Sequence, residues 1–542
     1  MDRYYHLAGW QHFHGYLLGI LRKEKKGRIR PFFSLRIKHK MYNHAMRING
    51  QLTGKVGTNT TKFDNAFLLI WLVFIATFPF VMDYLHLAPP GTQQSAIGHA
   101  YNLSIYKYNP SENIWIFPKV YFLVFTSLIL FLYVLTYKQF KNTFVYLLAA
   151  YAALALLSSI MSGDSLQYVL LGGEGRGDGL LYTAGLLLLA IFSYTVYIVH
   201  GKKALIYFYY ALSFSAILEA LVAILEHAGF DPIKFSSFSG LPIGTIGNSG
   251  MLASLLMVAV FAAIALVAQK ERGIGMWYSL LALVVISSGL GCAANRSSIG
   301  GLLIGLFALN IADMLFNKSK RFVFGSAVAV IALLLAPYVL PNNTGVSKTY
   351  TNPTTLKTRL LIWQISIEAI RKTPGQPFIG AGPDGLKLSI IKRDLLNLLL
   401  KEYKLEYGWK EDPELDTSIN IDRTGMPLKS YALPIKFPRS KSVRFMQVTL
   451  DKAHNLFLGR AVNYGLVSAF IWLLLYLVPM RTFFSFGKAH DALLLSGSSA
   501  LLALFVYYLF WFPAPQVEPI HVSLLSLLWG AKDSLISTKA KG

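Results

Sequence analysis

The sequence predicts an all-α polytopic membrane protein with about twelve transmembrane helices and a large helical outer loop between the ninth and tenth. Of its 542 residues, 54% are hydrophobic and only 14% are charged, whereas soluble domains carry about 25% charged residues. Runs of roughly 20 apolar residues recur along the chain, and each is long enough to cross a hydrocarbon core about 30 Å thick. Composition and spacing therefore favour a chain that crosses a membrane many times.

The expected spans follow the apolar runs in order. They are 65–82, 117–136, 143–161, 179–200, 204–227, 248–268, 275–294, 298–316, 322–341, 455–479, 491–512 and 517–532. The predicted organisation is a basic N-terminal segment at 1–62, nine helices within 63–341, an outer loop at 342–454, three helices within 455–532, and a tail at 533–542.

The basic residues predict the orientation. Residues 1–62 hold 13 Lys/Arg against two acids, and further basic residues fall in alternate short loops, at 138–141, 202–203, 270–272, 318–321 and 481–488. Basic loops stay on the cytoplasmic side, next to anionic lipids. We therefore expect both termini to be cytoplasmic and the segment 342–454 to be periplasmic or extracellular. We expect the basic residues behind the net charge of +24 to interact with anionic membrane lipids and not with nucleic acid.

Other sequence signals are weak or absent. The chain opens without the short apolar core of a signal peptide, so the first apolar run is expected to direct insertion. Cys292 is the only cysteine, which excludes an internal disulfide, and no Cys/His cluster has the spacing of a structural metal site. We expect neither a metal nor a cofactor.

The segment 342–454 is too long for a simple connection. Leu356, Leu360, Trp363, Ile367 and Ile370 recur at helical spacing and predict an amphipathic helix that stops at the sequence TPG. A second amphipathic stretch spans 386–407, and both stretches have the character of surface helices on a membrane. The segment carries 18 Lys/Arg against 11 Asp/Glu, which suits either bound phosphate or general attraction to the membrane surface.

Four polar clusters fall on the predicted outer side: GRGDGL (175–180), GTIGNSG (244–250), NRSS (295–298), and the long loop with KTRLLIW (357–363), GAGPDG (380–385) and DKAHN (451–455). GAGPDG fits neither nucleotide-binding glycine pattern, so we interpret it as a turn that lets two backbones approach closely. Glu219 lies inside the fifth apolar run, where either a transport path or hydrogen bonding between helices explains it.

Two arginines and one histidine carry the chemical hypothesis. Arg296 sits among small apolar residues near the membrane boundary, where it either snorkels to lipid phosphate or faces an inner cavity and binds phosphate. Arg359 is either one more basic residue of a surface helix or a second phosphate ligand. His454 is either a boundary histidine or a general base, and Asp451 is placed to orient it if the segment is already helical.

In their order, these clusters resemble the O-antigen ligase and O-antigen polymerase family of bacterial membrane glycosyltransferases. The matching residues are Arg176 and Gly179; Gly244, Thr245, Gly247 and Asn248; Asn295, Arg296 and Ser297; Arg359 and Trp363; Pro377, Gly380, Gly382 and Gly385; and Asp451, Lys452, Ala453, His454 and Asn455. The resemblance extends through NYGLVSAF (463–470) and covers roughly 65–530. The chain departs from the family at Leu386, where an aromatic is common, and at Asn463, where a glutamate is common.

The resemblance implies transfer of a glycan from an undecaprenyl-pyrophosphate carrier to an acceptor hydroxyl at the outer face of the bacterial inner membrane, without a metal. The catalytic residues would be His454 as the general base, and Arg296 and Arg359, which would hold the pyrophosphate and stabilise the charge that develops as it leaves. Arg176, Asn248, Asp451, Asn455 and Trp363 would support the donor or the catalytic residues. The acceptor would be a glycolipid, such as lipopolysaccharide, or another surface glycan.

Several functions share these residues. A ligase, a polymerase and an O-linked oligosaccharyltransferase differ in the acceptor, which the sequence does not specify. A lipid-linked glycan flippase belongs to a different class and would be expected to show repeated halves and several charges at the membrane midplane.

Overall fold

The computed structural model describes the following residues: 62–82, 116–137, 142–163, 166–172, 177–230, 232, 241–269, 274–317, 320–340, 354–372, 376–392, 395–407, 413–415, 432–437, 442–447, 452–488 and 491–539. The compact unit Thr61–Gly542 contains all of them. The predicted basic segment 1–62 lies outside the described residues except for Lys62.

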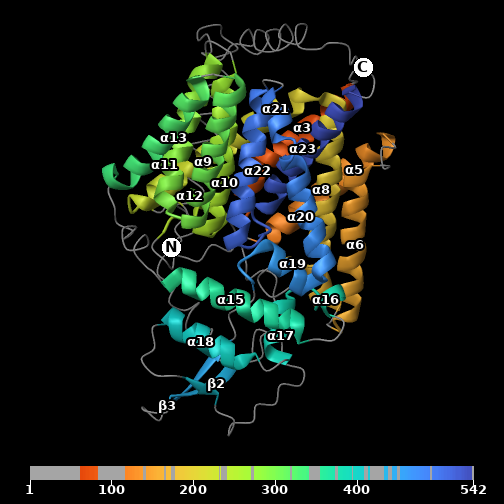
Figure 1. Cartoon of the computed structure of the whole chain (residues 1–542), viewed down its shortest axis with the longest axis vertical. Helices are drawn as coiled ribbons and strands as arrows, with labels where there is room; N and C mark the ends of the chain where they lie inside the picture. Colours follow the sequence, from red (N-terminus) through yellow and green to blue (C-terminus); the bar gives the residue numbers. More distant parts are fainter. Residues whose placement is uncertain are drawn as a thin grey trace, which may run out of the picture. The chain divides into compact units, whose positions relative to one another are not determined.

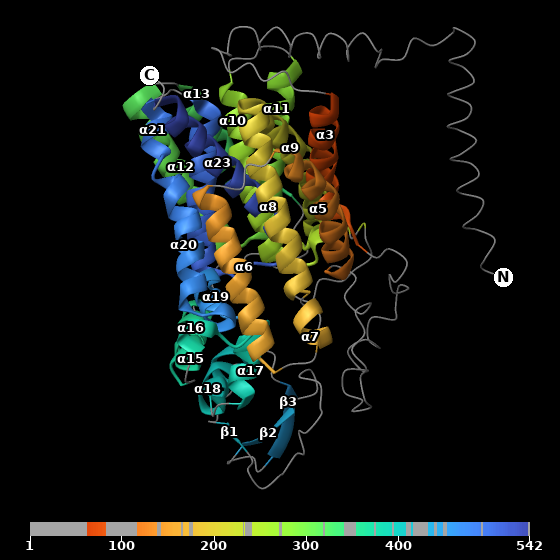
Figure 2. The ribbon, with the colours of Figure 1, turned by 90° about the vertical axis from the view of Figure 1, so that its right-hand side faces the viewer.

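Long helices that run in alternating directions dominate the unit (Figures 1 and 2). They are α3 (Lys62–Thr77, continued by η1, Phe78–Phe80), α5 (Phe117–Tyr137), α6 (Thr143–Met161), α8 (Leu180–His200), α9 (Lys202–His227), α10 (Ser249–Ala268), α11 (Ile274–Ala293), α12 (Arg296–Ala312, continued by η5, Asp313–Asn317), α13 (Lys320–Val339), α20 (Leu466–Met480), α22 (Ala492–Phe510) and α23 (Glu518–Lys539). Short helices α7 (Leu166–Leu171), η4 (Gly244–Ile246), α19 (Leu456–Tyr464) and α21 (Phe483–Lys488) connect them.

Eleven helices of the described part are long and apolar enough to cross a membrane, and this confirms the prediction of a polytopic membrane protein. The predicted number was about twelve, and the difference is α23, which is not among the eleven. Glu518, Lys532 and Asp533 make α23 more polar than a typical span. The predicted count of about twelve therefore includes one helix, α23, that is not apolar enough to be counted as a span by hydropathy.

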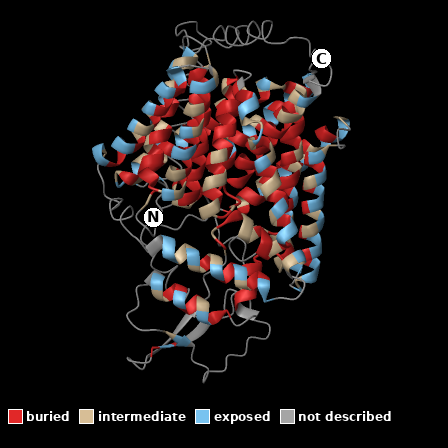
Figure 3. Cartoon of the chain, viewed as in Figure 1, coloured by how far each residue is buried: buried red, intermediate tan, exposed pale blue. Residues whose placement is uncertain are grey.

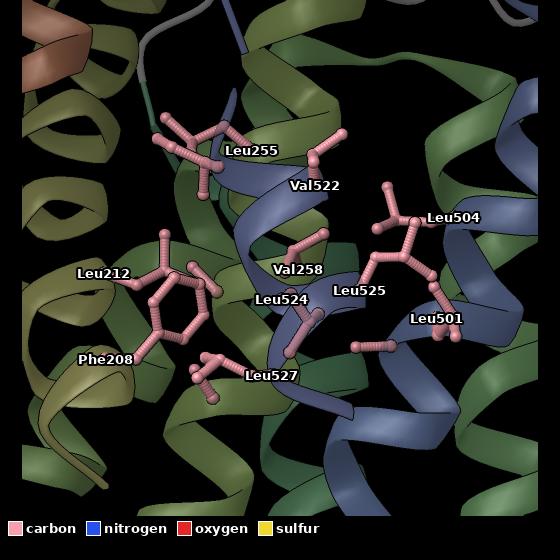
Figure 4. Packing of buried hydrophobic residues seen from close by; sticks show 14 of the residues in the cluster. Phe208, Leu212, Leu255, Val258, Leu501, Leu504, Val522, Leu524, Leu525 and Leu527 are labelled. Carbon is pink, nitrogen blue, oxygen red and sulfur yellow. The ribbon is translucent and has the colours of Figure 1, made fainter. Parts of the chain in front are cut away.

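α23 nevertheless lies in the centre of the bundle. Every residue from 514 to 531 is buried, and Figure 4 shows leucine and valine side chains of α23 packed among side chains of α9, α10 and α22. α10 is a second central helix, because all residues from Gly250 to Ala268 are buried. A helix that is apolar on all sides is the kind that occupies such a position. Figure 3 shows this buried centre and the exposed outer helix faces.

The predicted span 455–479 is two helices and not one. α19 ends at Tyr464, and α20 begins at Leu466, with Gly465 between them at φ +87°. A side chain at Gly465 would collide with the carbonyl oxygen of Phe378, which approaches the break from another segment. α20 is strongly apolar, whereas α19 carries Arg460 and Asn463, so the break coincides with a change in hydropathy that the single predicted span passed over.

The segment between α13 and α19 folds at one end of the bundle. It contains α15 (Thr354–Arg371), α16 (Gln376–Ile379), α17 (Gly385–Lys392), α18 (Leu396–Tyr407), and strands β1 (Glu414–Leu415), β2 (Ala432–Phe437) and β3 (Ser442–Gln447). The strands form an antiparallel sheet in the order β1-β2-β3. The predicted large helical loop is thus built on four helices with a small sheet that was not predicted, and the stretch 386–407 is two helices.

The buried face of α15 also differs from the predicted stripe. Leu356, Leu360 and Ile367 are exposed, whereas Ile362 and Ile365 are buried with residues of α17, α18 and β2. This second apolar core reaches α19, because Ala461 and Val462 belong to it, whereas Leu456 and Tyr464 belong to the core of the bundle. The nine residues of α19 thus join the two cores.

Candidate functional site

The predicted polar clusters gather at one end of the bundle, which we call the α15 end. It is the end at which α8, α10, α12 and α19 begin and α22 ends, and Figure 1 shows α15 to α18 on this side. Consecutive long helices run in opposite directions, so every second connection along the chain lies at the same end of the bundle. The predicted polar clusters lie in such alternate connections, and they therefore share one end. Which side of the membrane the α15 end faces stays a prediction.

Residues 452–455 of the DKAHN sequence lead into α19. Asn455 is the N-cap: its side-chain oxygen accepts hydrogen bonds from the backbone N–H groups of Phe457 (2.9 Å) and Leu458 (3.0 Å). Its Nδ2 donates to the carbonyl oxygen of Leu509 on α22 (3.0 Å). Asn455 therefore fixes the start of α19 to the end of α22, and this tertiary bond was not part of the sequence prediction.

His454 precedes this cap and lies against aromatic residues that follow α22. Its ring centroid is 5.5 Å from that of Trp511 and 5.0 Å from that of Phe512, with edge-on geometry in both pairs. Its carbonyl oxygen accepts a hydrogen bond from Nε1 of Trp363 (3.4 Å). The predicted supporting residue Trp363 thus contacts the backbone of the predicted base.

Arg359 meets His454 at the same aromatic residue. The guanidinium carbon of Arg359 is 5.0 Å from the ring centroid of Trp511, within the range of a cation–π contact. One turn later on α15, the ring of Trp363 lies 5.7 Å from that of Phe510. The spacing of Arg359 and Trp363 therefore docks α15 onto the end of α22, with an arginine and an imidazole on one indole.

Trp511 is the central residue of this arrangement, and sequence reasoning missed it. It contacts Arg359 and His454, and it stacks on Phe512 with ring centroids 5.6 Å apart. Gly250 faces its indole ring, and a side chain at that position would overlap it. The aromatic run YYLFWF at the end of a predicted span was the available signal, since aromatic residues that end an apolar run mark a boundary.

The GT-x-GN turn supports Trp511 from the other side. Asn248 caps α10, where its side-chain oxygen accepts hydrogen bonds from the backbone N–H groups of Gly250 (2.9 Å) and Met251 (3.2 Å). The hydroxyl of Tyr507 donates to the carbonyl oxygen of Gly250 (3.2 Å). Asn248, predicted as a donor-binding residue, therefore has a local capping role in this structure.

Charged side chains within the bundle hold the same turn. Glu219 accepts hydrogen bonds from the backbone N–H (3.1 Å) and the hydroxyl of Thr245. Glu226 accepts from the backbone N–H of Gly244 (2.9 Å). Lys119 donates to the carbonyl oxygen of Thr245 (3.1 Å). Glu219 is fully buried, and of the two explanations given for it, these bonds match the structural one.

Arg296 lies at the start of α12, at the same end of the bundle. Asn295 caps the helix by accepting a hydrogen bond from the backbone N–H of Ser298 (2.9 Å). α12 packs along α22 through Gly301 and Gly305, where a side chain would overlap α22. The Arg296 side chain is exposed, and it takes no part in the contacts that join Arg359 and His454 to Trp511.

GAGPDG and NYG form a close backbone contact, as predicted for a glycine turn. The N–H of Gly382 donates to the carbonyl oxygen of Asn463 (2.8 Å), and the N–H of Gly385 donates to the side-chain oxygen of Asn463 (3.1 Å). Gly380 has φ +82°, and a side chain there would collide with the Asn463 backbone. Asn463, where the family commonly has a glutamate, therefore accepts the hydrogen bonds that hold this turn.

A buried arginine inside the bundle was not predicted. Arg460 on α19 donates to Glu518 (2.7 Å) and to the hydroxyl of Tyr151 (2.6 Å), and its guanidinium lies 4.8 Å from the ring of Trp472. Tyr182 donates to the other oxygen of Glu518 (2.5 Å). The sequence offered no signal for this pair, because Arg460 and Glu518 are 58 residues apart.

Two predicted residues, Arg176 and Asp451, lie outside the described residues. Among the described residues, no group of three or more His, Cys, Asp or Glu side chains is arranged to hold a metal ion. The site therefore consists of Arg359, His454, Asn455 and Trp363 around Trp511, with Arg296 at the same end. No protein-family model matches the chain, and no curated protein matches it either.

Proposed function

We propose that the protein is a membrane glycosyltransferase that moves a glycan from a polyprenyl-pyrophosphate carrier to an acceptor hydroxyl. The observation that carries this proposal is the meeting of Arg359 and His454 on Trp511, where the bundle joins the segment that precedes α19. A lipid-held donor reaches such a place from the membrane, and a polar acceptor reaches it from the aqueous side. The resemblance to the O-antigen ligase and polymerase family motivates this assignment of substrates.

The proposed chemistry follows from the residue types. The imidazole of His454 accepts the proton of the acceptor hydroxyl as its oxygen attacks the anomeric carbon, a contribution of about 10²–10⁴-fold for a general base. The bond from that carbon to the pyrophosphate oxygen breaks, and the carrier pyrophosphate leaves with the bonding electrons. Arg359 stabilises the charge that develops on the leaving oxygen.

Aromatic neighbours suit both roles. The cation–π contact with Trp511 holds the Arg359 guanidinium at this end of the bundle, and a guanidinium is suited to bidentate binding of phosphate. The rings of Trp511 and Phe512 flank the imidazole of His454 and lower the polarity around it. We assign Arg296, at the same end of the bundle, as a second ligand of the pyrophosphate.

The acceptor defines which transferase this is. We favour a ligase that passes a glycan to a glycolipid or another surface polymer, with a polymerase or an O-linked oligosaccharyltransferase as alternatives that share the same residues. The proposed location is the bacterial inner membrane, with the α15 end on the outer side.

A lipid-linked glycan flippase is a second candidate, and buried charge favours it. Lys119 and Glu219 are both fully buried, and Arg460 and Glu518 form a further buried pair. Transporters place charged side chains within the membrane along the substrate path. Against this, each of these four side chains binds protein groups that hold helices or turns together.

The test is transfer in proteoliposomes that contain the protein, an undecaprenyl-pyrophosphate-linked glycan and candidate acceptors, with and without a chelator. The parent protein is expected to form product in both conditions, and His454→Ala and Arg359→Ala are expected to form it at least about 10²-fold more slowly. Arg371→Ala is the matched control, since Arg371 lies on the same helix with an exposed side chain. Movement of the donor between leaflets without product would replace this proposal by the flippase.

A further inference from the structure

Lys452 joins three of the sequence motifs, GRGDGL, GAGPDG and DKAHN, at one point. Its ammonium group forms ion pairs with Asp178, which precedes α8, and with Asp384 (3.4 Å), which precedes α17. Tyr168 on α7 donates a hydrogen bond to the other oxygen of Asp384 (3.0 Å). The Lys452 side chain is only 11% exposed and that of Asp384 only 4%. These charges are thus largely removed from water and bound to one another.

The segment that Lys452 binds also binds the other end of α19. Lys452 lies four residues before α19 and contacts Asp384, whereas Asn463, in the last turn of α19, binds the backbone of Gly382 and Gly385. The hydroxyl of Ser158 on α6 donates to the carbonyl oxygen of Asn463 (2.7 Å) and reinforces that end. The turn 380–385 therefore holds both ends of a nine-residue helix.

The backbone near both ends of the ion pair is strained. Asp384 has φ +55° and His454 has φ +49°, and they are two of the three non-glycine residues with positive φ in the described part of the chain. Residues other than glycine rarely adopt this backbone conformation, and it persists only where surrounding contacts enforce it. For His454 those contacts include the capping residue Asn455 on one side and the Lys452 ion pairs on the other.

We propose that Lys452 is a positioning residue, whose ion pairs with Asp178 and Asp384 set the place of α19 and thereby hold His454 against Trp511. The kinetic part of this inference rests on the glycan transfer proposed above. The ion pairs act at a distance from the substrate, through the turn that carries His454.

Removing the ammonium group tests the proposal. Lys452→Met keeps most of the side-chain length, and it is expected to lower kcat for glycan transfer about 10- to 100-fold, because a shift of about 1 Å in a catalytic group has an effect of that size. The KM for the donor is expected to stay within about twofold. Lys452→Arg, which restores the charge, is expected to recover most of kcat.

A double-variant comparison identifies the ion pair as the cause. Asp384→Asn alone is expected to lower kcat, and Lys452→Met with Asp384→Asn is expected to be no worse than Lys452→Met alone, because Lys452→Met has already removed the ion pair with Asp384. Lys202→Met is the matched control. It removes a lysine–aspartate ion pair, Lys202 with Asp491 (2.5 Å), at the opposite end of the bundle, and it is expected to leave kcat unchanged.

Amide hydrogen exchange gives a readout that needs no substrate. Lys452→Met is expected to speed exchange at the N–H groups of Gly382 and Gly385 and along α19, and Lys202→Met is not. If the parent protein transfers no glycan, the proposed function fails and exchange alone decides the role of Lys452. Unchanged exchange in Lys452→Met would overturn the inference, and so would a raised KM with unchanged kcat, which would indicate direct donor binding.

Discussion

Among the residues that the structure describes, Arg359 and Arg460 each stack on a tryptophan ring, and their surroundings differ. Arg460 lies 4.8 Å from the ring of Trp472 inside the bundle, with a carboxylate and a tyrosine hydroxyl bound to its guanidinium. Arg359 lies 5.0 Å from the ring of Trp511 at the α15 end, partly exposed and next to His454. The comparison teaches that stacking does not distinguish a structural arginine from one that suits a substrate. Burial does distinguish them, because Arg460 is buried together with the carboxylate of Glu518, whereas Arg359 is partly exposed.

The largest expected effect on stability is at Arg460. Arg460→Ala leaves the carboxylate of Glu518 buried without its cation, and breaking such a pair costs about 3–5 kcal/mol. Thermal unfolding in detergent should show a large fall in Tm. A second variant, Arg460→Met with Glu518→Gln, should recover part of the loss, and equal destabilisation by both would contradict the ion-pair explanation.

Asn455→Ala is expected to have the next largest effect on stability. It removes the cap of α19 and the bond to Leu509, a combined loss of about 1–2 kcal/mol in unfolding free energy. Asn455→Asp keeps the cap acceptor and loses only the bond to Leu509, so it should lie between the two. The same unfolding measurement checks this order, and an Asp variant as unstable as Ala would weaken the capping argument.

Arg359→Ala sharpens the comparison, because it is expected to change stability little and glycan transfer strongly, whereas the effect expected at Arg460 is on stability. An exposed or partly exposed cation–π contact contributes about 0.5–1 kcal/mol, so Tm should change little. Glycan transfer should fall by about 10²–10³-fold, as when a group that stabilises transition-state charge is removed. Measuring Tm and transfer on the same preparation separates these effects, and a variant that is both unstable and inactive would place Arg359 with Arg460.

The smallest expected effect is at Arg371. Its ion pair with Glu368 (3.6 Å) is on the surface, with the arginine side chain 75% exposed, and such pairs contribute about 0–1 kcal/mol. Arg371→Ala should leave both Tm and transfer close to those of the parent. A clear loss of transfer would mean that the positive charge of α15 as a whole, and not Arg359 in particular, supports activity.

Hydropathy could predict most of the bundle, because lipid imposes the same demand on every spanning helix. The spans expected at 143–161 and 248–268 agree with α6 and α10 to within one residue at each end. The break at Gly465 was not predicted, although Asn463 and Gly465 interrupt the apolar run, because the contact that requires it comes from the distant backbone of Phe378. The sheet was missed because the polar segment was interpreted by its helical stretches alone.

The residues of the candidate site were named before their arrangement was known. His454 was conspicuous as an imidazole before an apolar run, whereas Arg359, Trp363 and Asn455 were chosen through the resemblance to the O-antigen ligase and polymerase family. Trp511 carries no such signal, and its role depends on contacts with two segments far from it in the chain. Lys452 was noted only as one letter of a motif, and its ion pairs became visible only in the fold.

The central place of α23 bears on the order in which the protein is made. The ribosome delivers α8, α9, α10 and α22 before α23, and these are the helices against which α23 packs. Until α23 has been synthesised and inserted, its place at the centre of the bundle is unfilled, and Arg460 lacks the carboxylate of Glu518 with which it pairs in the folded protein. Assembly of the membrane part is therefore completed from its centre, by the last helix to leave the ribosome among those described.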